Sequence, residues 1–435
     1  MKKIKNFGDI KMKTQKILFG ILIILALLIV GCENSSEVLN PVNKGNSLSS
    51  NSSNDLSKSS DLYLSSPGAV YAMTNSVDGN EIVAFERSIK GTLKFLDAYS
   101  TKGVGSGGEI DPLGSQGSVI LSSSPAITPA SANRWLFAVN AGSNQISSFG
   151  VKEGRLELRD LVSSGGEFPV SLTAYGNLLY VLNAKGAAVI RNREEYSGGN
   201  ITGFHINSDG RLSMIPKSTR PLSIGEDVNP AEIQFSPDGK YLVVTEKTTN
   251  IIDVYQVKEN GLTEGPIIYN SVGETPFGFV FDQKDRIIVS EEVAGTPYAS
   301  SASLYELGSH GGIHIASSSV PTYQTAGSWI SVTNDGRLAF ISNTLSNTIT
   351  ALEIIDDQLR IVQDDGIAAN TGDRSLPIDL AVSQDSHFLY VLEAGLGTIG
   401  AFEVQPTGDL KPIEISLDLS GYLPANAGVQ GLAAY

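Results

Sequence analysis

The sequence predicts an all-β protein, a seven-bladed β-propeller, and three observations support this prediction. A pair of alternating apolar runs recurs seven times after residue 67, roughly once every 50 residues. Short turn sequences such as "SPDGK" and "NSDGR" separate the runs. Helical periodicity and helix-capping signals are essentially absent. Seven four-stranded units joined by tight turns are typical of this fold.

Each repeat contains an apolar run that ends in a polar residue, followed by a second run that ends in a large apolar residue. In one copy "LFAVN" precedes "NQISSF", and in another "LYVLE" precedes "GTIGAF". The first runs end at Asn75, Asn140, Asn183, Glu246, Glu291, Asn343 and Glu393. The second runs end at Phe85, Phe149, Phe204, Tyr255, Tyr305, Leu352 and Phe402. A short strand precedes each pair, clearest in "AEIQFSPDGKY", and another strand follows it, which gives four strands per unit.

The two ends of the repeat region predict how the ring closes. The first unit begins at "VYAMTN" and lacks the strand that precedes the pair in other units. The chain ends in "GVQGLAAY", which aligns with "PAEIQFS" and "LPIDLAVS" and has no unit after it. We therefore expect the C-terminal strand to be the innermost strand of blade 1, which removes a free sheet edge.

The N-terminal residues are typical of a targeting signal. Six lysines come before the 14-residue apolar run "ILFGILIILALLIV", which is too short to span a bilayer comfortably. The run stops at "IVGC", which resembles a bacterial lipobox and implies cleavage before Cys32 and lipidation of its thiol. A plain membrane anchor with an incidental cysteine is the alternative. The predicted organisation is a signal peptide over 1–31, the lipidated Cys32 with a Ser/Asn-rich tether over 32–66, and the propeller over 67–435.

Charge and cysteine content exclude several classes of protein. Cys32 is the only cysteine, so an intramolecular disulfide and a zinc–thiolate cluster are excluded. Residues 1–31 carry a net charge of +5, so the remaining chain carries −20 against −15 for the whole. Nucleic acid and anionic lipid headgroups repel such a surface. We expect an extracytoplasmic monomer that a lipid alone attaches to a bacterial membrane, with no nucleic-acid partner.

Connection lengths predict which face carries function. With the strands of a blade named A to D from the axis outward, the A–B and C–D turns are short. The long segments, such as "TKGVGSGGEIDPLGSQGSVILSS" and "AKGAAVIRNREEYSGG", follow strand D or strand B. Because the B–C and D–A connections share one face of a propeller, long loops gather there, and binding sites are common on such loops. We call this the long-loop face and the opposite one the short-turn face.

Acidic residues at two repeat positions open on the long-loop face and are the candidate ligand-binding residues. Glu232, Trp329 and Asp379 lie near the starts of A strands, and Glu246, Glu291 and Glu393 end B strands. Carboxylates that converge on one axis need compensation, which Ca²⁺ or a polar or cationic ligand would supply. The alternatives are that the Asn and Glu side chains bind the backbone of the B–C turns and that Trp329 packs between blades. The pair of histidines in "HGGIH" lies on a C–D turn, so no cofactor is expected from it.

Three stretches, "FSPDGKYLVV", "LYVLNAKG" and "FLYVLEAGLGTIGAFEVQPTGDL", resemble the lactonase-type seven-bladed propeller family over roughly residues 68 to 435. That family includes 6-phosphogluconolactonases and 3-carboxymuconate lactonizing enzymes, which gather His, Arg and Glu at the channel mouth. In "PAEIQFSPDGKYLVVTE", Glu246 matches the family's Glu and becomes the catalytic candidate, whereas Ala231 and Glu232 stand where Arg and His would be.

Two functions follow from the resemblance and the missing His and Arg. The first is a surface-tethered propeller that binds a small polar ligand or a surface protein. The alternative is an extracytoplasmic lactonase or lactonizing enzyme with a rearranged site.

Overall fold

A computed structural model of the protein describes residues 68–122, 134–185, 189–191, 194–196, 198–223, 227–414 and 421–435. The chain divides into two units, Met1–Leu62 and Tyr63–Tyr435, and every described residue belongs to the second. The predicted signal peptide, Cys32 and the predicted tether lie outside the described residues. No helix within the described ranges is long and apolar enough to cross a membrane.

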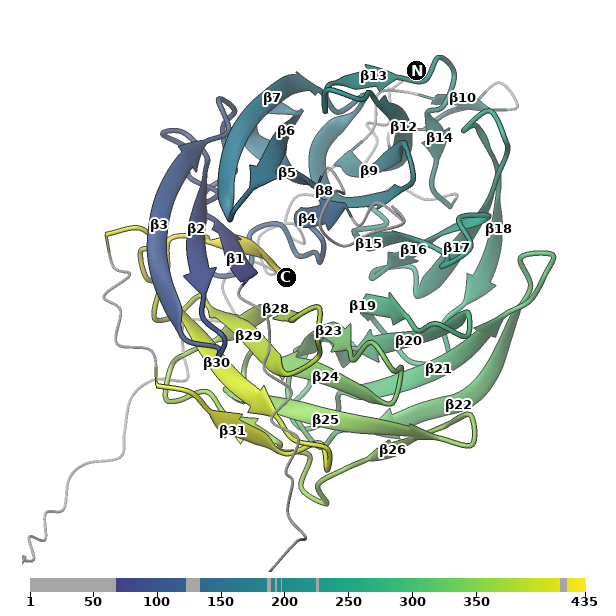
Figure 1. Cartoon of the computed structure of the whole chain (residues 1–435). Coiled ribbons are helices and arrows are strands. Elements are labelled where there is room, and N and C mark those ends of the chain that lie inside the picture. The colour runs from purple at the N-terminus through teal and green to yellow at the C-terminus, as the bar shows by residue number, and fades with distance from the viewer. Residues whose placement is uncertain are drawn as a thin grey trace, which may run out of the picture. The chain divides into compact units, whose positions relative to one another are not determined.

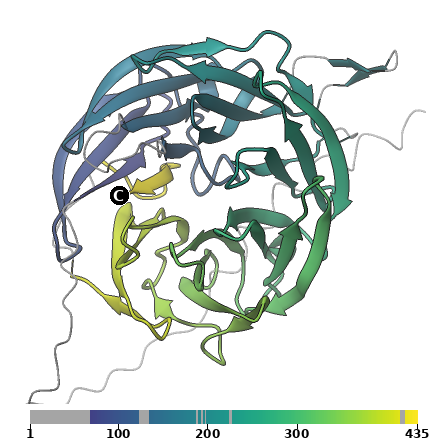
Figure 2. The same cartoon turned by 45° about the vertical axis from the view of Figure 1, so that its right-hand side comes forward.

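Seven antiparallel sheets surround a central axis, so the predicted seven-bladed β-propeller is confirmed (Figure 1, Figure 2). The strands of blade 1, from the axis outward, are β32 (Gln430–Ala434), β1 (Gly68–Met73), β2 (Glu81–Arg87) and β3 (Leu93–Ser100). Those of blade 2 are β4 (Val119–Ser122), β5 (Arg134–Asn140), β6 (Gln145–Lys152) and β7 (Arg155–Ser163). Those of blade 3 are β8 (Glu167–Tyr175), β9 (Leu178–Lys185), β12 (Asn200–Ile206) and β13 (Leu212–Met214), with β14 (Arg220–Pro221) also paired to β12.

The remaining four blades repeat this order. Blade 4 contains β15 (Pro230–Phe235), β16 (Tyr241–Glu246), β17 (Ile251–Val257) and β18 (Thr263–Asn270). Blade 5 contains β19 (Pro276–Phe281), β20 (Arg286–Glu291), β21 (Ser301–Leu307) and β22 (Ile313–Pro321). Blade 6 contains β23 (Gly327–Val332), β24 (Leu338–Asn343), β25 (Thr348–Ile355), β26 (Gln358–Ile361) and β27 (Ala369–Asn370). Blade 7 contains β28 (Pro377–Val382), β29 (Phe388–Glu393), β30 (Thr398–Val404) and β31 (Leu410–Pro412).

Three short elements lie between these strands. The hairpin of β10 (Val189–Arg191) and β11 (Glu194–Tyr196) belongs to the B–C connection of blade 3. The 3₁₀ turns η1 (Ala141–Ser143) and η2 (Val293–Gly295) belong to the B–C connections of blades 2 and 5. The longer connections therefore lie on the long-loop face.

The ring closes as the sequence predicts, through the C-terminal strand. Strand β32 pairs antiparallel with β1, and Val70 lies opposite Ala434. The backbone N–H of Tyr435 donates to the carbonyl of Ala69 at 3.0 Å, and the N–H of Ala69 donates back at 3.2 Å. The two chain ends of the propeller thus lie side by side on the short-turn face, close to the axis (Figure 1).

Large apolar residues fill the space between blades. All seven residues that end the second runs of the repeats are buried. Tyrosines on B strands add a recurring polar link, since the hydroxyl of each donates to a carbonyl in the C–D turn of the next blade. The four links are Tyr71 to Gly154 at 3.0 Å, Tyr180 to Gly261 at 2.6 Å, Tyr241 to Ser309 at 2.6 Å and Tyr390 to Gly91 at 2.9 Å. These links fix the angle between neighbouring blades.

Candidate functional site

A segment of the D–A connection before blade 2, residues 111–118, crosses the central channel; we call it the plug. The hydroxyl of Ser115 donates to the carbonyl of Val170 in blade 3 at 2.8 Å, and the N–H of Gln116 donates to Ala231 in blade 4 at 3.1 Å. The Gln116 side chain donates to the carbonyl of Ile330 in blade 6 at 2.7 Å and accepts from its N–H at 2.9 Å. The plug therefore joins three blades across the axis.

Two neighbours make room for the plug and support it. Gly278 has no side chain because a Cβ there would lie 2.2 Å from Oε1 of Gln116. Trp329 is 1% exposed, packs on Phe277 with ring centroids 4.9 Å apart, and donates its indole N–H to the Ser115 carbonyl at 2.9 Å. Trp329, in blade 6, thus packs against Phe277 of blade 5 and against the plug, and its ring is not exposed for stacking.

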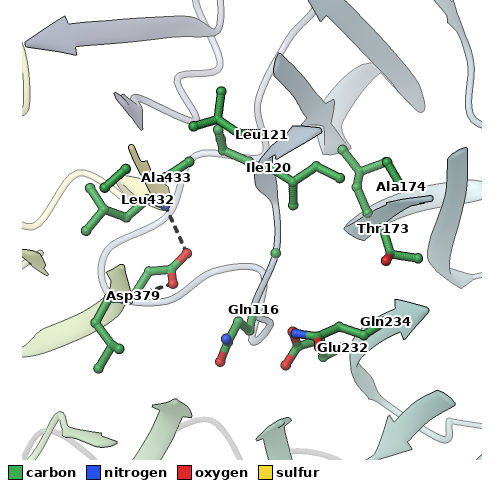
Figure 3. Close-up of a pocket in the computed structure, with 15 residues that line it drawn as sticks. Gln116, Ile120, Leu121, Thr173, Ala174, Glu232, Gln234, Asp379, Leu432 and Ala433 are labelled. Atoms are coloured by element: carbon green, nitrogen blue, oxygen red, sulfur yellow. Dashed lines mark hydrogen bonds between the residues drawn. The ribbon is translucent and has the colours of Figure 1, made fainter. Parts of the chain in front are cut away.

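On the short-turn side of the plug the channel widens into a cavity of about 320 Å³ (Figure 3). Glu232 and Asp379 line it, and Figure 3 shows Gln116 between them. Glu232 accepts from the amide of Gln234 and from the N–H of Phe279, both at 2.6 Å. Asp379 accepts from the backbone N–H groups of Leu380 at 2.9 Å and Leu432 at 3.0 Å.

Burial raises the pKa of both cavity carboxyls. It raises the pKa of Asp379 to about 7 and that of Glu232 well above its usual range, with a smaller contribution to Glu232 from the charge of Asp379. No Lys or Arg in the described part of the chain contributes to either pKa. The cavity is therefore a place where carboxyl groups favour the neutral form.

The three predicted glutamates at the ends of B strands lie inside their own blades. Glu246 accepts from the N–H of Ser223 at 2.9 Å and from the hydroxyls of Ser223 and Thr249, both at 2.5 Å. It also lies beside Asp253, and burial together with the charge of Glu246 raises the pKa of Asp253 to about 9. Glu246, the catalytic candidate, is fully buried in this network.

Glu291 and Glu393 have equivalent surroundings. Glu291 accepts from the hydroxyls of Ser301 and Ser303 and from the N–H of Gly273 at 3.0 Å. Glu393 accepts from the hydroxyl of Thr398 at 2.7 Å, and burial raises its pKa to about 7.

The asparagines that end other B strands make similar bonds. The Asn140 amide donates to Ser147 at 2.8 Å, and the Asn343 amide donates to Thr350 at 2.9 Å. In these two blades the side chain therefore fastens strand B to the start of strand C rather than to the turn backbone alone.

The five predicted acidic residues consequently do not form one mouth. The structure brings Glu232 and Asp379 to one cavity and separates them from Glu246, Glu291 and Glu393, which lie in blades 4, 5 and 7. Among the described residues no group of three His, Cys, Asp or Glu side chains could hold a metal ion.

A different set of charges lies on the long-loop side of the plug: Asp111, Lys247 and Glu292, which we call the mouth cluster. Asp111 begins the plug, whereas Lys247 and Glu292 are the first residues after strands β16 and β20. Lys247 is 8% exposed, donates to the Gly114 carbonyl, and places its Nζ 4.6 Å from the centre of the Phe277 ring. Its charge acts on both carboxyl groups.

The mouth cluster shifts the pKa of all three members. Burial raises the pKa of Asp111 to about 7 although the Lys247 charge opposes the shift, and burial likewise raises the pKa of Glu292. Burial lowers the pKa of Lys247 while the two carboxylates raise it. The site thus contains one cation and two carboxyl groups of raised pKa, of which Asp111 can exchange a proton near neutral pH.

The C-terminal strand holds Asp111 in place. The amide of Gln430 donates to Oδ1 of Asp111 at 2.7 Å, and the N–H of Gly114 donates to the same oxygen at 2.9 Å. Strand β32 has a bulge at Gly431, whose φ of 74° is in the left-handed region, where glycine carries no steric penalty. A bulge re-aims the neighbouring side chain, here that of Gln430, toward the plug.

Sequence reasoning missed the mouth cluster, although a signal for it was present. Lys247 and Glu292 each directly follow a glutamate that ends a B strand, in "EK" and "EE". Since side chains alternate along a strand, the residue after an inward-pointing Glu points out of the blade. Asp111 lies within one of the long segments that mark the long-loop face.

Comparisons with known proteins find lactonase similarity over parts of the chain. A family model described as "Lactonase, 7-bladed beta-propeller" matches residues 195–307, which include Lys247 and Glu292. A 6-phosphogluconolactonase of Serratia proteamaculans is 32% identical over 60 residues. That alignment covers 14% of this chain and 18% of the relative's length.

Solved structures share the whole propeller. A Bacteroides fragilis protein assigned as a 6-phosphogluconolactonase aligns with a TM-score of 0.62 at 18% identity, over 87% of this chain and 99% of that one. The periplasmic gluconolactonase of Pseudomonas aeruginosa aligns with a TM-score of 0.60 at 15% identity, over 84% of this chain and 99% of that one. At these identities the likeness extends to the fold alone. The chain is therefore a seven-bladed β-propeller in which residues 195–307 match the lactonase family model.

Proposed function

We propose that this protein opens a lactone ring by hydrolysis at the mouth cluster on its long-loop face. The single observation that carries the proposal is the buried ammonium of Lys247, which donates to the plug at Gly114 and whose charge acts on two carboxyl groups of raised pKa. The match of residues 195–307 to the lactonase model, which includes two of the three residues, supports it. Hence the enzymatic alternative from the sequence is better supported than a purely binding role.

The chemistry of ring opening fits these three residues. A water oxygen bonds to the lactone carbonyl carbon while a base takes the water proton, and the ring C–O bond then breaks and its oxygen takes a proton. With its pKa raised to about 7, Asp111 is partly ionised near neutral pH and can act as that base. Lys247 would stabilise the oxyanion of the tetrahedral intermediate, and Glu292 would return a proton to the ring oxygen. The same groups serve ring closure in reverse, as a lactonizing enzyme requires.

A panel of sugar lactones offered to the full-length protein in detergent tests the proposal. We expect hydrolysis of at least one lactone and a loss of about 100-fold or more in kcat/KM for Asp111→Asn. Asp209→Asn is the matched control, because Asp209 lies on an exposed C–D turn of the short-turn face. Equal activity of Asp111→Asn and the parent protein would remove the proposed base.

A second candidate function is binding without catalysis, of a small polar ligand or a surface protein. Exposed apolar side chains on the long-loop face favour it: Tyr298 is 73% exposed, Tyr323 51% and Leu345 57%. Their loops are joined, since the N–H of Tyr298 donates to Thr325 and the N–H of Thr325 donates to Ser346. Loss of binding in Tyr298→Ala with unchanged lactone hydrolysis would separate the two functions.

We further propose that the protein is lipid-anchored through Cys32 outside the cytoplasm, on the basis of "LIVGC" and the lack of any other cysteine. Cys32→Ser is expected to release the protein from membranes or to leave it unprocessed. Membrane-bound protein of unchanged mature mass in that variant would contradict the anchor.

A further inference from the structure

We propose that the cavity on the short-turn side of the plug is a second ligand-binding site and that it holds a small organic ammonium ion. The cavity has a volume of about 320 Å³, and two of the described residues that line it carry carboxyl groups while none is Lys, Arg or His. Its volume lies at the lower end of the range of about 300 to 1,000 Å³ that is usual for small-molecule pockets. The plug separates this site from the mouth cluster, so it is independent of lactone hydrolysis.

The cavity has a polar inner end and an apolar opening. A strands run from the long-loop face to the short-turn face, so residues late in an A strand lie nearer the short-turn opening. Glu232 and Asp379 are each the third residue of a six-residue A strand, and each is 2% exposed. Leu121, Ala174 and Ala434 lie within the last two residues of their strands and are partly exposed. A ligand can therefore enter at the short-turn face and bring a polar group to the two carboxyls.

Both carboxyl groups keep acceptor positions for a ligand. Each of their oxygens accepts one hydrogen bond, and all four donors are neutral backbone or amide N–H groups. A carboxylate can accept about four hydrogen bonds, so about half of the acceptor positions on Glu232 and Asp379 remain open. The four existing bonds fix the orientation of the two side chains, which lowers the cost of ordering them around a ligand.

A hydroxyl group on the cavity wall also lacks a partner for its proton. Thr173 is 8% exposed, lines the cavity (Figure 3), and accepts from the N–H of Phe235 at 3.0 Å. Its own O–H donates to no group among the described residues. A buried donor without an acceptor is unfavourable, and a ligand hydroxyl would provide the acceptor. An ammonium ion that also carries a hydroxyl group would use both the carboxyls and Thr173.

The charge of the cavity favours a cation over an anion or a neutral molecule. Among the described residues neither Glu232 nor Asp379 forms an ion pair with a basic side chain. An anion would be repelled by these groups, and a neutral ligand would leave them uncompensated. A hard metal ion takes about six or more oxygen ligands, whereas an ammonium group needs only about three acceptors. The alkyl part of the ligand would then contact the apolar wall.

The two carboxyls give binding a dependence on pH. Burial raises the pKa of Asp379 to about 7 and that of Glu232 well above its usual range. The charged groups of the described chain that act on this pair are the two carboxyls themselves and Asp111 of the plug, all of them acidic. An ammonium ion binds the ionised form, so below about pH 7 it must displace a proton. We expect its affinity to increase about tenfold between about pH 6 and about pH 8.

Calorimetry on the full-length protein in detergent tests the ligand class with three molecules of similar shape: 4-amino-1-butanol, 1,4-butanediol and 4-hydroxybutyrate. We expect a Kd of about 1 mM or lower for the amine at about pH 8 and much weaker binding of the diol and the acid. Equal or tighter binding of either of these two, or no binding of the amine at about 10 mM, overturns the proposal.

Variants show whether the amine occupies this cavity. Asp379→Asn should weaken its binding about tenfold or more and reduce the pH dependence. Glu403→Gln is the matched control, because Glu403 lies on the third strand of the same blade and pairs with Lys411 at 3.5 Å. Ala174→Leu narrows the opening without changing a carboxyl and should also weaken binding, even if Asp379→Asn does not fold.

A variant of the mouth cluster completes the test. Glu292→Gln removes a carboxyl on the other side of the plug and should leave amine binding unchanged. Binding that is lost in Glu292→Gln would place the amine at the mouth cluster and overturn the proposal. Unchanged binding in both Asp379→Asn and Ala174→Leu would overturn it as well.

Discussion

The two sides of the plug contain similar carboxyl groups but differ in one respect. On the short-turn side, Glu232 and Asp379 line a cavity in which the described residues place no cation. On the long-loop side, the charge of Lys247 acts on the carboxyl groups of both Asp111 and Glu292. Burial raises all four pKa values, so burial alone does not distinguish the two places. The difference teaches that a perturbed pKa indicates chemistry only where a partner charge can stabilise what the reaction produces.

The largest effect on stability is expected from removing strand β32, which contacts the carboxyl groups on both sides of the plug. Deleting residues 428–435 removes strand β32, which provides the inner edge of blade 1, the Leu432 N–H bound to Asp379, and the Gln430 amide bound to Asp111. We expect aggregation, or a fall in melting temperature large enough to abolish cooperative unfolding. Scanning calorimetry and size-exclusion chromatography measure this. A truncated protein that melts like the parent would contradict the closure.

Removing the charge of Lys247 should leave the carboxyl groups of the mouth cluster without a positively charged neighbour, as the carboxyl groups of the cavity are. Lys247→Met keeps an unbranched apolar chain over Phe277 but leaves Asp111 and Glu292 without a positive neighbour. The expected result is a loss of about 100-fold or more in kcat/KM for the best lactone and a rise in the pKa of both carboxyls. Lys240→Met is the control, since Lys240 is exposed on a turn of the same blade and pairs with Asp238. Equal losses in both variants would show that Lys247 has no special role.

Weakening the hydrogen bonds of the plug should lower the free energy of unfolding of the propeller. Gln116→Leu leaves the N–H and the carbonyl of Ile330 without their side-chain partners, at a cost of about 2 to 4 kcal/mol in the free energy of unfolding. Gln405→Leu is the comparison, because the structure records only backbone hydrogen bonds for Gln405. Denaturant unfolding provides the measurement. If both variants unfold at the same denaturant concentration, the plug does not contribute to stability.

The smallest expected effect is a dependence of the free energy of unfolding on pH, to which carboxyl groups on both sides of the plug and inside the blades contribute. Folding raises the pKa of Asp111, Asp379 and Glu393 to about 7 and that of Asp253 to about 9. Between the unfolded and folded values the native state keeps protons that the unfolded chain has lost, so stability falls as pH rises through this window. We expect the melting temperature to be several degrees lower at about pH 8 than at about pH 5. Asp253→Asn should flatten this slope, and a melting temperature that increases with pH would contradict it.

The blades could be predicted from the sequence because each is built from local signals. Alternating runs, turn residues and their recurrence need no knowledge of distant contacts, and the unpaired first repeat and extra last strand implied the closure between β1 and β32. Likewise, Glu232, Trp329 and Asp379 are each the third residue of an A strand, and the repeat alignment placed them together near the axis.

The site could be predicted only in part, for two physical reasons. Side chains alternate along a strand, so the Glu246 side chain points into its blade and that of Lys247, one residue later, points toward the long-loop face. The alignment of the repeats identified the end of the B strand but not which way each side chain points. The plug depends on contacts such as Gln116 to Ile330, which are 214 residues apart in the chain, and no local pattern encodes such a pair. Lys247 comes close to Asp111 only after the plug has folded across the channel, so the alignment of the repeats could not predict that the two residues meet.

Closure by the last strand has a consequence for how the protein is made. Strand β32 follows all the other described strands in the chain, so the ring stays open during synthesis until this strand has been made. Until then Asp111 also lacks the Gln430 amide that holds it. The proposed lactone-opening activity should therefore require strand β32, and chains terminated before this strand would be inactive however many complete blades they contain.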